Sequence, residues 1–428
     1  MTYQETLNYL FEQLPVYQRA GKAAYKADLA NTMVLDKYFG HPHRKFRTIH
    51  VAGTNGKGSV SHMLASVLHS AGYRTGLYTS PHLLDFRERI KINGKMISKE
   101  DVVFFVQQHK ELLERVQPSF FEMTVAMAFD YFARQGVDVA VVEVGLGGRL
   151  DSTNIITPDL SVITNIGLDH TLFLGDTLEA IAGEKAGIIK SGVPVVLGRF
   201  QEETVSVFRN KAEKERAPLF FASQIAKVNR VVERGDCQEV DVEAKIWGGV
   251  YCLPLMGRYQ QENLITVAAA LNLLSRAWYE LSEKAIFSGI QDVVKNTGLM
   301  GRWQKISDKP LMVCDTGHNA DGVERVMEQL RSTEKEILHI VWGMVNDKDL
   351  ESVLRLLPVH ARYYFTKASI PRALDPELLA GAAEEHGLQG QVYENVKTAV
   401  EAAKKNASDN DLIFIGGSTF VVAEALEK

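Results

Sequence analysis

The sequence predicts an α/β protein of two domains, each built around a mostly parallel sheet. The chain has 428 residues, which is more than one ordinary hydrophobic core holds. Apolar strands alternate with helical patterns in the first half of the chain, and the same alternation starts again after residue 310. Strands connected through helices lie parallel to one another, and the helices cover both faces of the sheet.

The N-terminal domain is expected to begin with a helix at residues 4–14, which Pro15 ends. The first buried strand, 48–52, leads into a glycine-rich turn at 53–59 and then into a helix at 60–71. Apolar runs and turn residues define the elements that follow. The predicted strands are 74–78, 137–144, 160–165 and 193–197, and the predicted helices lie near 99–116, 122–135 and 177–190.

The pattern changes at residues 219–255, where short β-rich runs with Gly-Asp and Gly-Gly turns indicate hairpins. Helical patterns follow at 260–277 and 282–294. The segment KNTGLMGR, 295–302, is interpreted as an interdomain linker because it places two glycines between periodic segments. We therefore expect domains at 1–296 and 297–428, with a ligand-binding cleft between them. The smaller second domain has predicted strands at 311–314, 338–342, 363–366 and 411–415, each followed by a helix.

Composition excludes several classes of protein. A net charge of −5 argues against a general nucleic-acid binder, which needs a basic face. The three cysteines, Cys237, Cys252 and Cys314, are an odd number without C-x-x-C spacing, so we expect neither a disulfide framework nor a zinc site. The polar N-terminus does not resemble a signal peptide, and no apolar run approaches the roughly 18 residues that cross a bilayer. We expect a cytoplasmic monomer that binds small molecules, without nucleic-acid or membrane partners.

The segment HVAGTNGKGSV, residues 50–60, is the strongest local signal. Glycines let several backbone N–H groups point at one phosphate chain, the following helix adds its positive end, and a lysine supplies a mobile cation. The loop differs from G-x-x-x-x-G-K-[ST], because Val51 stands where the first glycine would fall. A glycine-rich turn without a ligand is the alternative. The candidate phosphate contacts are Thr54, Asn55, Gly56, Lys57, Gly58 and Ser59.

Further motifs carry a resemblance to a known family. They are TSPHLLDFRERIKING (79–94), VEVGLGGRLDSTN (142–154), TNIGLDH (164–170), GEKAGIIK (183–190), GRWQ (301–304), DTGHNADG (315–322) and DKD (347–349). Together they resemble the folylpolyglutamate synthase/dihydrofolate synthase family of the Mur ligase superfamily, in the right order over nearly the whole chain. The resemblance implies a P-loop Mur-ligase-type N-terminal domain and a Rossmann-like C-terminal domain. Two departures are Thr316-Gly317 in place of the usual Gly-Ala, and Trp303-Gln304 where a glutamate often follows Arg302.

Metal-binding candidates stand at the ends of the predicted strands. Glu143 ends the apolar run DVAVVEV, and a buried acid must find a cation or donors; a salt bridge with Arg149 is the alternative to a metal ion. The resemblance implies that Ser80 and Glu143 hold one Mg²⁺, which prefers oxygen ligands, and that His170 holds a second. It also implies that Lys185 is carbamylated and helps to hold the second ion. The alternatives are a turn residue at Ser80 and an exposed helical lysine at Lys185. A capping or core histidine is the alternative at His170.

The resemblance also implies nucleotide contacts in the second half of the chain. An arginine neutralises phosphate charge and an aspartate accepts ribose hydroxyls, which are the roles implied for Arg302 and Asp315, while Asn263 would contact the adenine side. His318 and Lys348 are further candidates, with solvent-facing loop residues as the alternative. The catalytic candidates are Lys57, Lys185 and His318.

Two segments resemble the contacts of the family with a pterin-bearing substrate. Aromatic rings suit a flat heterocycle, although Phe120 and Phe121 are equally suited to a hydrophobic core. The substrate-binding candidates are Ser119, Phe120, Phe121 and Glu122 in the first segment, and Leu150, Asp151 and Ser152 in the second.

The resemblance implies an ATP-dependent ligase that activates a carboxylate as an acyl phosphate and joins it to the amine of L-glutamate. The cofactors would be ATP and Mg²⁺, and the acceptor would be dihydropteroate, a reduced folate, or both. One alternative is a peptidoglycan Mur-type ligase with a UDP-sugar substrate, against which the TSPHL and RLDSTN segments argue. An alternative from another class is a P-loop switch or transport NTPase, which would hydrolyse ATP without a carboxylate substrate.

Overall fold

The first long buried strand, β1 (Arg47–Ala52), organises the N-terminal part of the computed structural model. The model describes residues 1–13, 28–277, 279–346 and 348–427. The predicted helix at 4–14 corresponds to α1 (Tyr3–Gln13), and its expected stop at Pro15 lies outside the described residues. Among the described residues, no helix is both long enough and apolar enough to span a membrane.

The described chain divides into two units. The first comprises Met1–Gly167, Thr171–Pro254 and Gln260–Leu299, and the second comprises Leu168–His170, Leu255–Tyr259 and Met300–Lys428. The short loop Leu168–His170 therefore belongs to the second unit, although its neighbours in sequence belong to the first. The domain boundary predicted between residues 296 and 297 stays a prediction.

Among the described residues of the first unit, eight strands form one sheet in the order β4-β3-β2-β5-β1-β6-β7-β8. Its pairs are parallel except where β3 meets β2 and β4. The predicted strands are confirmed, whereas the short strands β3 and β4 were not predicted. β8 lies at the start of the β-rich region predicted at 219–255, but it pairs in parallel with β7 and does not form a hairpin. Besides β1, the strands are β2 (Thr75–Tyr78), β3 (Ile90–Ile92), β4 (Lys95–Met96), β5 (Val139–Glu143), β6 (Leu160–Ile163), β7 (Val195–Leu197) and β8 (Leu219–Phe221).

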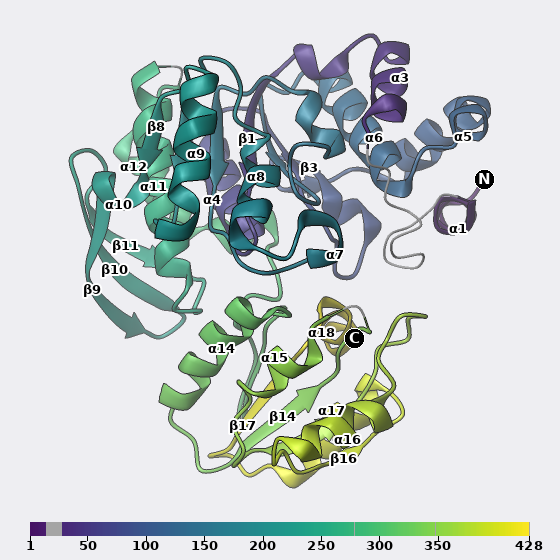
Figure 1. The fold of residues 1–428 in the computed structure, drawn as a ribbon, viewed down its shortest axis with the longest axis vertical. Coiled ribbons are helices and arrows are strands. Elements are labelled where there is room, and N and C mark those ends of the chain that lie inside the picture. Colours follow the sequence, from purple (N-terminus) through teal and green to yellow (C-terminus); the bar gives the residue numbers. More distant parts are fainter. Residues whose placement is uncertain (14–27, 278, 347, 428) are drawn as a thin grey trace. The chain divides into compact units, whose positions relative to one another are not determined.

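Helices cover both faces of this sheet (Figure 1). The helix α4, which follows β1, packs against β1, β2 and β5 and against α11 and α12. Crossovers between parallel strands are right-handed, so α6, α8 and α9, whose connections run the opposite way along the sheet, cover the other face. The helices of this unit are α3 (Ala30–Tyr38), α4 (Lys57–Ser70), α5 (Lys99–Val116), α6 (Phe120–Arg134), α7 (Thr171–Leu174), α8 (Leu178–Ala186), α9 (Glu202–Lys214), α10 (Ala222–Ile225), α11 (Gln260–Ala277), α12 (Glu283–Gln291) and α13 (Val293–Thr297), with 3₁₀ turns η2 (Pro42–Arg44), η3 (Phe86–Arg89) and η4 (Ser152–Ile155).

The predicted hairpin region forms a separate antiparallel sheet of β9 (Ala226–Arg234), β10 (Cys237–Ala244) and β11 (Gly249–Leu253). Cys237 and Cys252 form a disulfide between β10 and β11, with their Cα atoms 5.7 Å apart. The expectation of no disulfide is therefore wrong for this pair, because antiparallel pairing brings the two cysteines together in a way that their total number does not reveal. Cys314 is free and buried.

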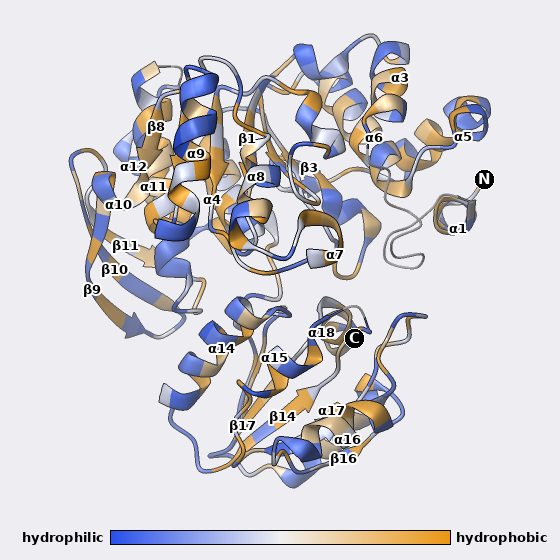
Figure 2. Ribbon diagram, in the orientation of Figure 1, coloured by the Kyte–Doolittle hydropathy of each residue, from blue (hydrophilic) through white to orange (hydrophobic). Residues whose placement is uncertain are grey.

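The second unit has its own sheet in the order β12-β13-β17-β14-β15-β16, parallel except for the edge strand β12. Figure 2 shows β14 in the hydrophobic colour, as expected for a strand covered on both faces. The Rossmann-like prediction is confirmed, and the edge strands β12 and β16 were not predicted. The elements are β12 (Gln304–Asp308), β13 (Leu311–Cys314), β14 (Leu338–Trp342), β15 (Arg362–Phe365), β16 (Gly390–Val392), β17 (Leu412–Gly416), α14 (Ala320–Ser332), α15 (Leu350–Leu354), α16 (Pro376–Glu385), α17 (Val396–Asn406) and α18 (Thr419–Leu426).

The contact between α12 and α4 predicts a specific effect on stability. A Cβ added at Gly289 would lie 2.5 Å from the Cα of Val67, so Gly289→Ala should lower the free energy of unfolding by about 1–3 kcal/mol. Gly183, in α8, has open space around its Cβ position, and Gly183→Ala should raise stability by about 0.5–1 kcal/mol. Urea denaturation of both variants checks this, and equal effects would contradict the packing described.

Candidate functional site

The glycine-rich turn after β1 takes a shape that only glycines allow. Gly53 and Gly56 have φ angles of 146° and 84°, which side chains rarely adopt. A Cβ at Gly53 would lie 1.9 Å from the Oγ1 of Thr164. Gly56 is also the N-cap of α4, so the turn delivers the backbone directly into a helix N-terminus. This is the geometry of a phosphate-binding loop.

Two lysines meet at one backbone oxygen of this turn. The Nζ of Lys57 donates to the carbonyl oxygens of Gly53 at 2.9 Å and Thr54 at 3.1 Å. The Nζ of Lys185, a buried residue of α8, also donates to the Gly53 oxygen, at 3.0 Å. The exposed-lysine alternative for Lys185 is therefore excluded. Positive charge is concentrated at this turn, as a site for a polyanion requires.

A second loop, which follows β6, fixes the turn through hydrogen bonds. The backbone oxygen of Asn165 accepts a hydrogen bond from the N–H of Thr54. The side-chain oxygen of Asn165 accepts from the N–H of Asn55. Thr164 donates its hydroxyl to the carbonyl of Asn55, and Thr54 exchanges two hydrogen bonds with Gly167. Thr164, Asn165 and Gly167 were not among the predicted site residues. The available signal was the parallel pairing of β1 with β6, which places their carboxyl ends together.

Ser80 and Glu143 also lie together in the first unit. Glu143 ends β5 and is buried, and its Oε2 accepts from the backbone N–H of Ser80 at 3.2 Å. Arg149, the alternative partner, instead pairs with Glu184 at 2.9 Å. A carboxylate and a hydroxyl are oxygen ligands that fit one Mg²⁺ completed by water. Within the described ranges, no group of three or more His, Cys, Asp or Glu side chains forms a ready-made metal site.

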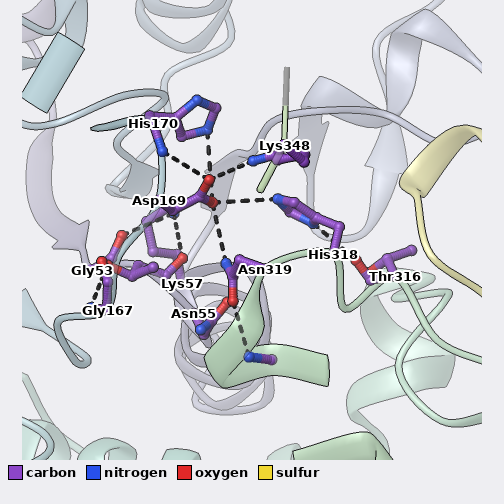
Figure 3. Close-up of polar contacts among 12 residues, drawn as sticks. Gly53, Asn55, Lys57, Gly167, Asp169, His170, Thr316, His318, Asn319 and Lys348 are labelled. Carbon is purple, nitrogen blue, oxygen red and sulfur yellow. Dashed lines mark hydrogen bonds and ion pairs between the residues drawn. The ribbon is translucent and has the colours of Figure 1, made fainter. Parts of the chain in front are cut away.

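Asp169 is the centre of a polar cluster in the second unit (Figure 3). Its carboxylate accepts from the Nζ of Lys348, from the Nδ2 of Asn319 at 3.1 Å and from the backbone N–H of His170 at 2.8 Å, while the Nε2 of His318 lies 3.4 Å away. Burial raises the pKa of Asp169, but the hydrogen bond from His318 and the positive charges nearby outweigh this and hold the pKa well below its usual range. His318 and Lys348 are thus engaged with a half-buried carboxylate. Asp347 of the DKD segment lies outside the described residues.

Asp315 is buried at the end of β13 and is held by three donors. The Oη of Tyr259 and the backbone N–H groups of Trp303 and Gly317 donate to its carboxylate at 2.5, 2.7 and 2.8 Å. Burial raises the pKa of Asp315, against the lowering effect of these hydrogen bonds and of Arg302. Trp303 and Gly317, which both stand at departures from the family pattern, contact this carboxylate through their backbones and not through their side chains.

Arg302 lies beside Asp315 in the same unit. Its Nη1 donates to the carbonyl oxygen of Gly301 at 3.2 Å and to the hydroxyl of Thr316. The side chain of Gln304 accepts from the N–H of Gly301 at 2.8 Å, which fixes the turn before Arg302.

The segment nominated as a substrate contact begins α6. Ser119 and Glu122 form a capping box, in which the Ser119 hydroxyl accepts from the Glu122 N–H and Glu122 accepts from the Ser119 N–H at 2.6 Å. Phe120 is buried in the core, as its alternative interpretation predicts. The guanidinium carbon Cζ of Arg89 lies over this ring, 5.2 Å from the ring centroid. The ring of Phe121 lies against Gly145 at the end of β5.

The second nominated segment forms the loop after β5. Asp151 is buried, and its carboxylate accepts from the N–H groups of Gly145 at 3.0 Å, Leu146 at 2.9 Å and Thr153 at 3.0 Å. These bonds shape the loop itself. Leu150 is half-buried and Ser152 is buried beside it.

Comparison with known proteins identifies the class of enzyme. The family model of the Mur ligase middle domain matches residues 51–271, and that of the Mur ligase glutamate ligase domain matches 301–419. The chain is therefore an ATP-dependent ligase of the Mur type, in agreement with its phosphate-binding loop and two α/β sheets.

Individual relatives narrow this class. The chain is 34% identical to a Bacillus subtilis dihydrofolate synthase/folylpolyglutamate synthase, covering 95% of this chain and 96% of that protein. It is similar to the structure of Mycobacterium tuberculosis folylpolyglutamate synthase complexed with ADP, with a TM-score of 0.88, 31% identity and coverage of 99% and 97%. It is also 34% identical to a Haloferax volcanii probable bifunctional folylpolyglutamate synthase/dihydropteroate synthase, matching 99% of this chain and spanning half of that longer protein. The chain belongs to the folylpolyglutamate synthase/dihydrofolate synthase family.

The position of Lys57 predicts a large loss of activity on its removal. Lys57→Ala takes away the cation at the turn, and kcat/KM for ATP should fall at least about 100-fold, as for other groups that stabilise developing charge. Steady-state kinetics and circular dichroism measure activity and folding. Lys214→Ala, at an exposed position of α9, is the control and should be unchanged. A folded Lys57→Ala enzyme with wild-type turnover would refute the assignment.

Proposed function

We propose that the chain uses ATP to join L-glutamate to the carboxylate of a folate-type substrate. The observation that carries the proposal is the phosphate-binding turn with Lys57 and Lys185 on the Gly53 carbonyl, next to the loop that follows β6. Relatives over nearly the full length bear the names dihydrofolate synthase and folylpolyglutamate synthase. These names support a folate substrate over the UDP-sugar of a peptidoglycan ligase.

The chemistry of amide formation explains the residues that are gathered here. A carboxylate at neutral pH needs a leaving group before an amine can displace its oxygen, and phosphorylation by ATP supplies one. Backbone N–H groups of Gly56–Ser59, where α4 begins, and the ammonium of Lys57 would stabilise the charge on the transferred phosphoryl group. Bound Mg²⁺, held by Ser80 and Glu143, would neutralise phosphate charge. Arg302 and Asp315 would contact the nucleotide, and Asn263 its base.

We further propose that the chain is bifunctional. It would make dihydrofolate from dihydropteroate, and then add γ-linked glutamates to reduced folates. The support is the double name of the Bacillus subtilis relative, whose length the chain matches at 96%.

A product assay tests this function. With ATP, Mg²⁺ and glutamate, mass spectrometry should find a new amide both with dihydropteroate and with tetrahydrofolate. ATP hydrolysis should be slow until one of them is added. Product from tetrahydrofolate alone would limit the enzyme to chain extension. ATP hydrolysis that is independent of any carboxylate, with no amide product, would instead support the P-loop switch or transport NTPase.

The position of Lys185 leads to a second proposal, that its amine is carbamylated. The carbamate would place oxygen donors where an ammonium now faces the Gly53 carbonyl, and would suit a second Mg²⁺ held also by His170. The support for this proposal is that Lys185 is buried, with its amine on the Gly53 carbonyl.

Carbamylation predicts a distinctive pattern among variants. Lys185→Ala should be nearly inactive and partly rescued by short carboxylic acids that replace the carbamate. Lys185→Arg should stay poor although it keeps the charge, because arginine does not form the carbamate. Turnover with and without added acetate measures this. Full activity of Lys185→Arg would show that the residue acts only as a cation.

A further inference from the structure

Gln260, the first residue of α11, links two residues around the phosphate-binding turn. Its Nε2 donates to the Oγ of Ser59 at 3.0 Å, and its Oε1 accepts from the Nδ2 of Asn263 at 2.8 Å. Gln260 is 0% exposed, and Ser59 and Asn263 are also buried. All three residues lie in the first unit. The result is a buried series of hydrogen bonds from α11 to α4.

In the structure the NH₂ group of Asn263 faces Gln260, so the oxygen of the Gln260 amide accepts from it. The NH₂ group of the Gln260 amide then faces Ser59 and donates to its hydroxyl. The Ser59 hydroxyl has one proton and two lone pairs, and Gln260 occupies one of the lone pairs. The bond from Gln260 leaves the proton and the second lone pair of Ser59 for a phosphate oxygen and a metal ion at the turn.

Asn263, at the other end of this series of hydrogen bonds, contacts the phosphate-binding turn itself. A Cβ added at Gly56 would lie 2.3 Å from the Oδ1 of Asn263, so this amide rests directly on the backbone that begins α4. Gln260 therefore controls both the orientation of the Ser59 hydroxyl and the placement of the Asn263 amide over Gly56. A side chain that only filled the core would need no donor toward Ser59.

We infer that Gln260 is a positioning residue for the nucleotide, which sets the Ser59 hydroxyl for the phosphates and Mg²⁺ before they bind. The inference rests on the proposed binding of ATP at this turn and adds the residue that orients it. Gln260 touches neither the nucleotide nor the metal in this account. Its effect passes through Ser59 and Asn263, so loss of Gln260 should weaken nucleotide binding without changing how glutamate binds.

The test uses Gln260→Met, which keeps the length of the side chain and removes both hydrogen bonds. The KM for ATP and the Mg²⁺ concentration for half-maximal activity should each rise about tenfold, the effect of about one hydrogen bond. The KM for glutamate should stay unchanged. The matched control is Gln261→Met, at the neighbouring residue whose side chain bonds to Gln238 at 3.0 Å; it should leave all three constants at wild-type values.

A double-mutant cycle with Ser59→Ala separates positioning from a structural role. If Gln260 acts through Ser59, Gln260→Met should add no further Mg²⁺ requirement in the Ser59→Ala background. If the increases in Mg²⁺ requirement caused by Gln260→Met and Ser59→Ala multiplied in the double mutant, the inference would be overturned. It would also be overturned if Gln260→Met lowered only the melting temperature and left the KM for ATP unchanged. Should Gln260→Met fail to fold, Gln260→Glu retains the acceptor for Asn263 and replaces the donor to Ser59, and at pH 8 the same rise is expected.

Calorimetric titration with Mg²⁺ and ADP keeps this test distinct from that of the ligase activity. The titration needs no carboxylate substrate, so weaker ADP binding by Gln260→Met would support the inference even if no folate product formed. Equal ADP affinity in Gln260→Met and the wild type would overturn it. A wild-type enzyme that bound no nucleotide would overturn the proposed function and the inference together.

Discussion

The site depends on the close approach of Gly53 and Thr164, where the neighbouring strands β1 and β6 end. No side chain fits at Gly53, because its Cβ would fall 1.9 Å from the Thr164 hydroxyl. This approach lets the loop after β6 bond to the backbone of the turn, and it leaves the Gly53 carbonyl open to Lys57 and Lys185. A turn made rigid in this way presents its N–H groups without reorganisation when phosphate binds, which is how preorganised sites stabilise charge.

The parallel sheet explains why residues far apart in sequence meet at this turn. The carboxyl ends of parallel strands face one edge, where open α/β sheets bind ligands. β5 ends in Glu143, β2 leads to Ser80, and β1 leads to the turn. Other buried polar residues near these strand ends form hydrogen bonds within their own loops. Asp151, for example, accepts from backbone N–H groups of its own loop. Nucleotide contact and loop support are thus divided between different side chains.

The sequence predicts the fold better than it predicts the supports of the site. Long apolar strands such as β14 are recognisable because burial on both faces requires them, whereas β4, with only Lys95 and Met96, is an edge pair defined by its neighbour. Lys57 and Glu143 are recognisable because glycines or an apolar strand surround them. Gln260 and Asp169 are not, because their importance comes from partners at Ser59 and Lys348, which only the folded chain brings near. The disulfide of Cys237 was missed for the same reason.

The central claim is that ATP bound at this turn phosphorylates a carboxylate, and isotope transfer tests it most directly. The substrate is prepared with ¹⁸O in the carboxylate that reacts, and the phosphate released during amide formation is examined by mass spectrometry. In an acyl phosphate, one carboxylate oxygen bridges the carbon and the phosphorus. When the amine attacks the carbon, the phosphate leaves and carries this bridging oxygen with it. The account predicts one ¹⁸O in each phosphate released. Phosphate without ¹⁸O, in a reaction that still forms the amide, would contradict it.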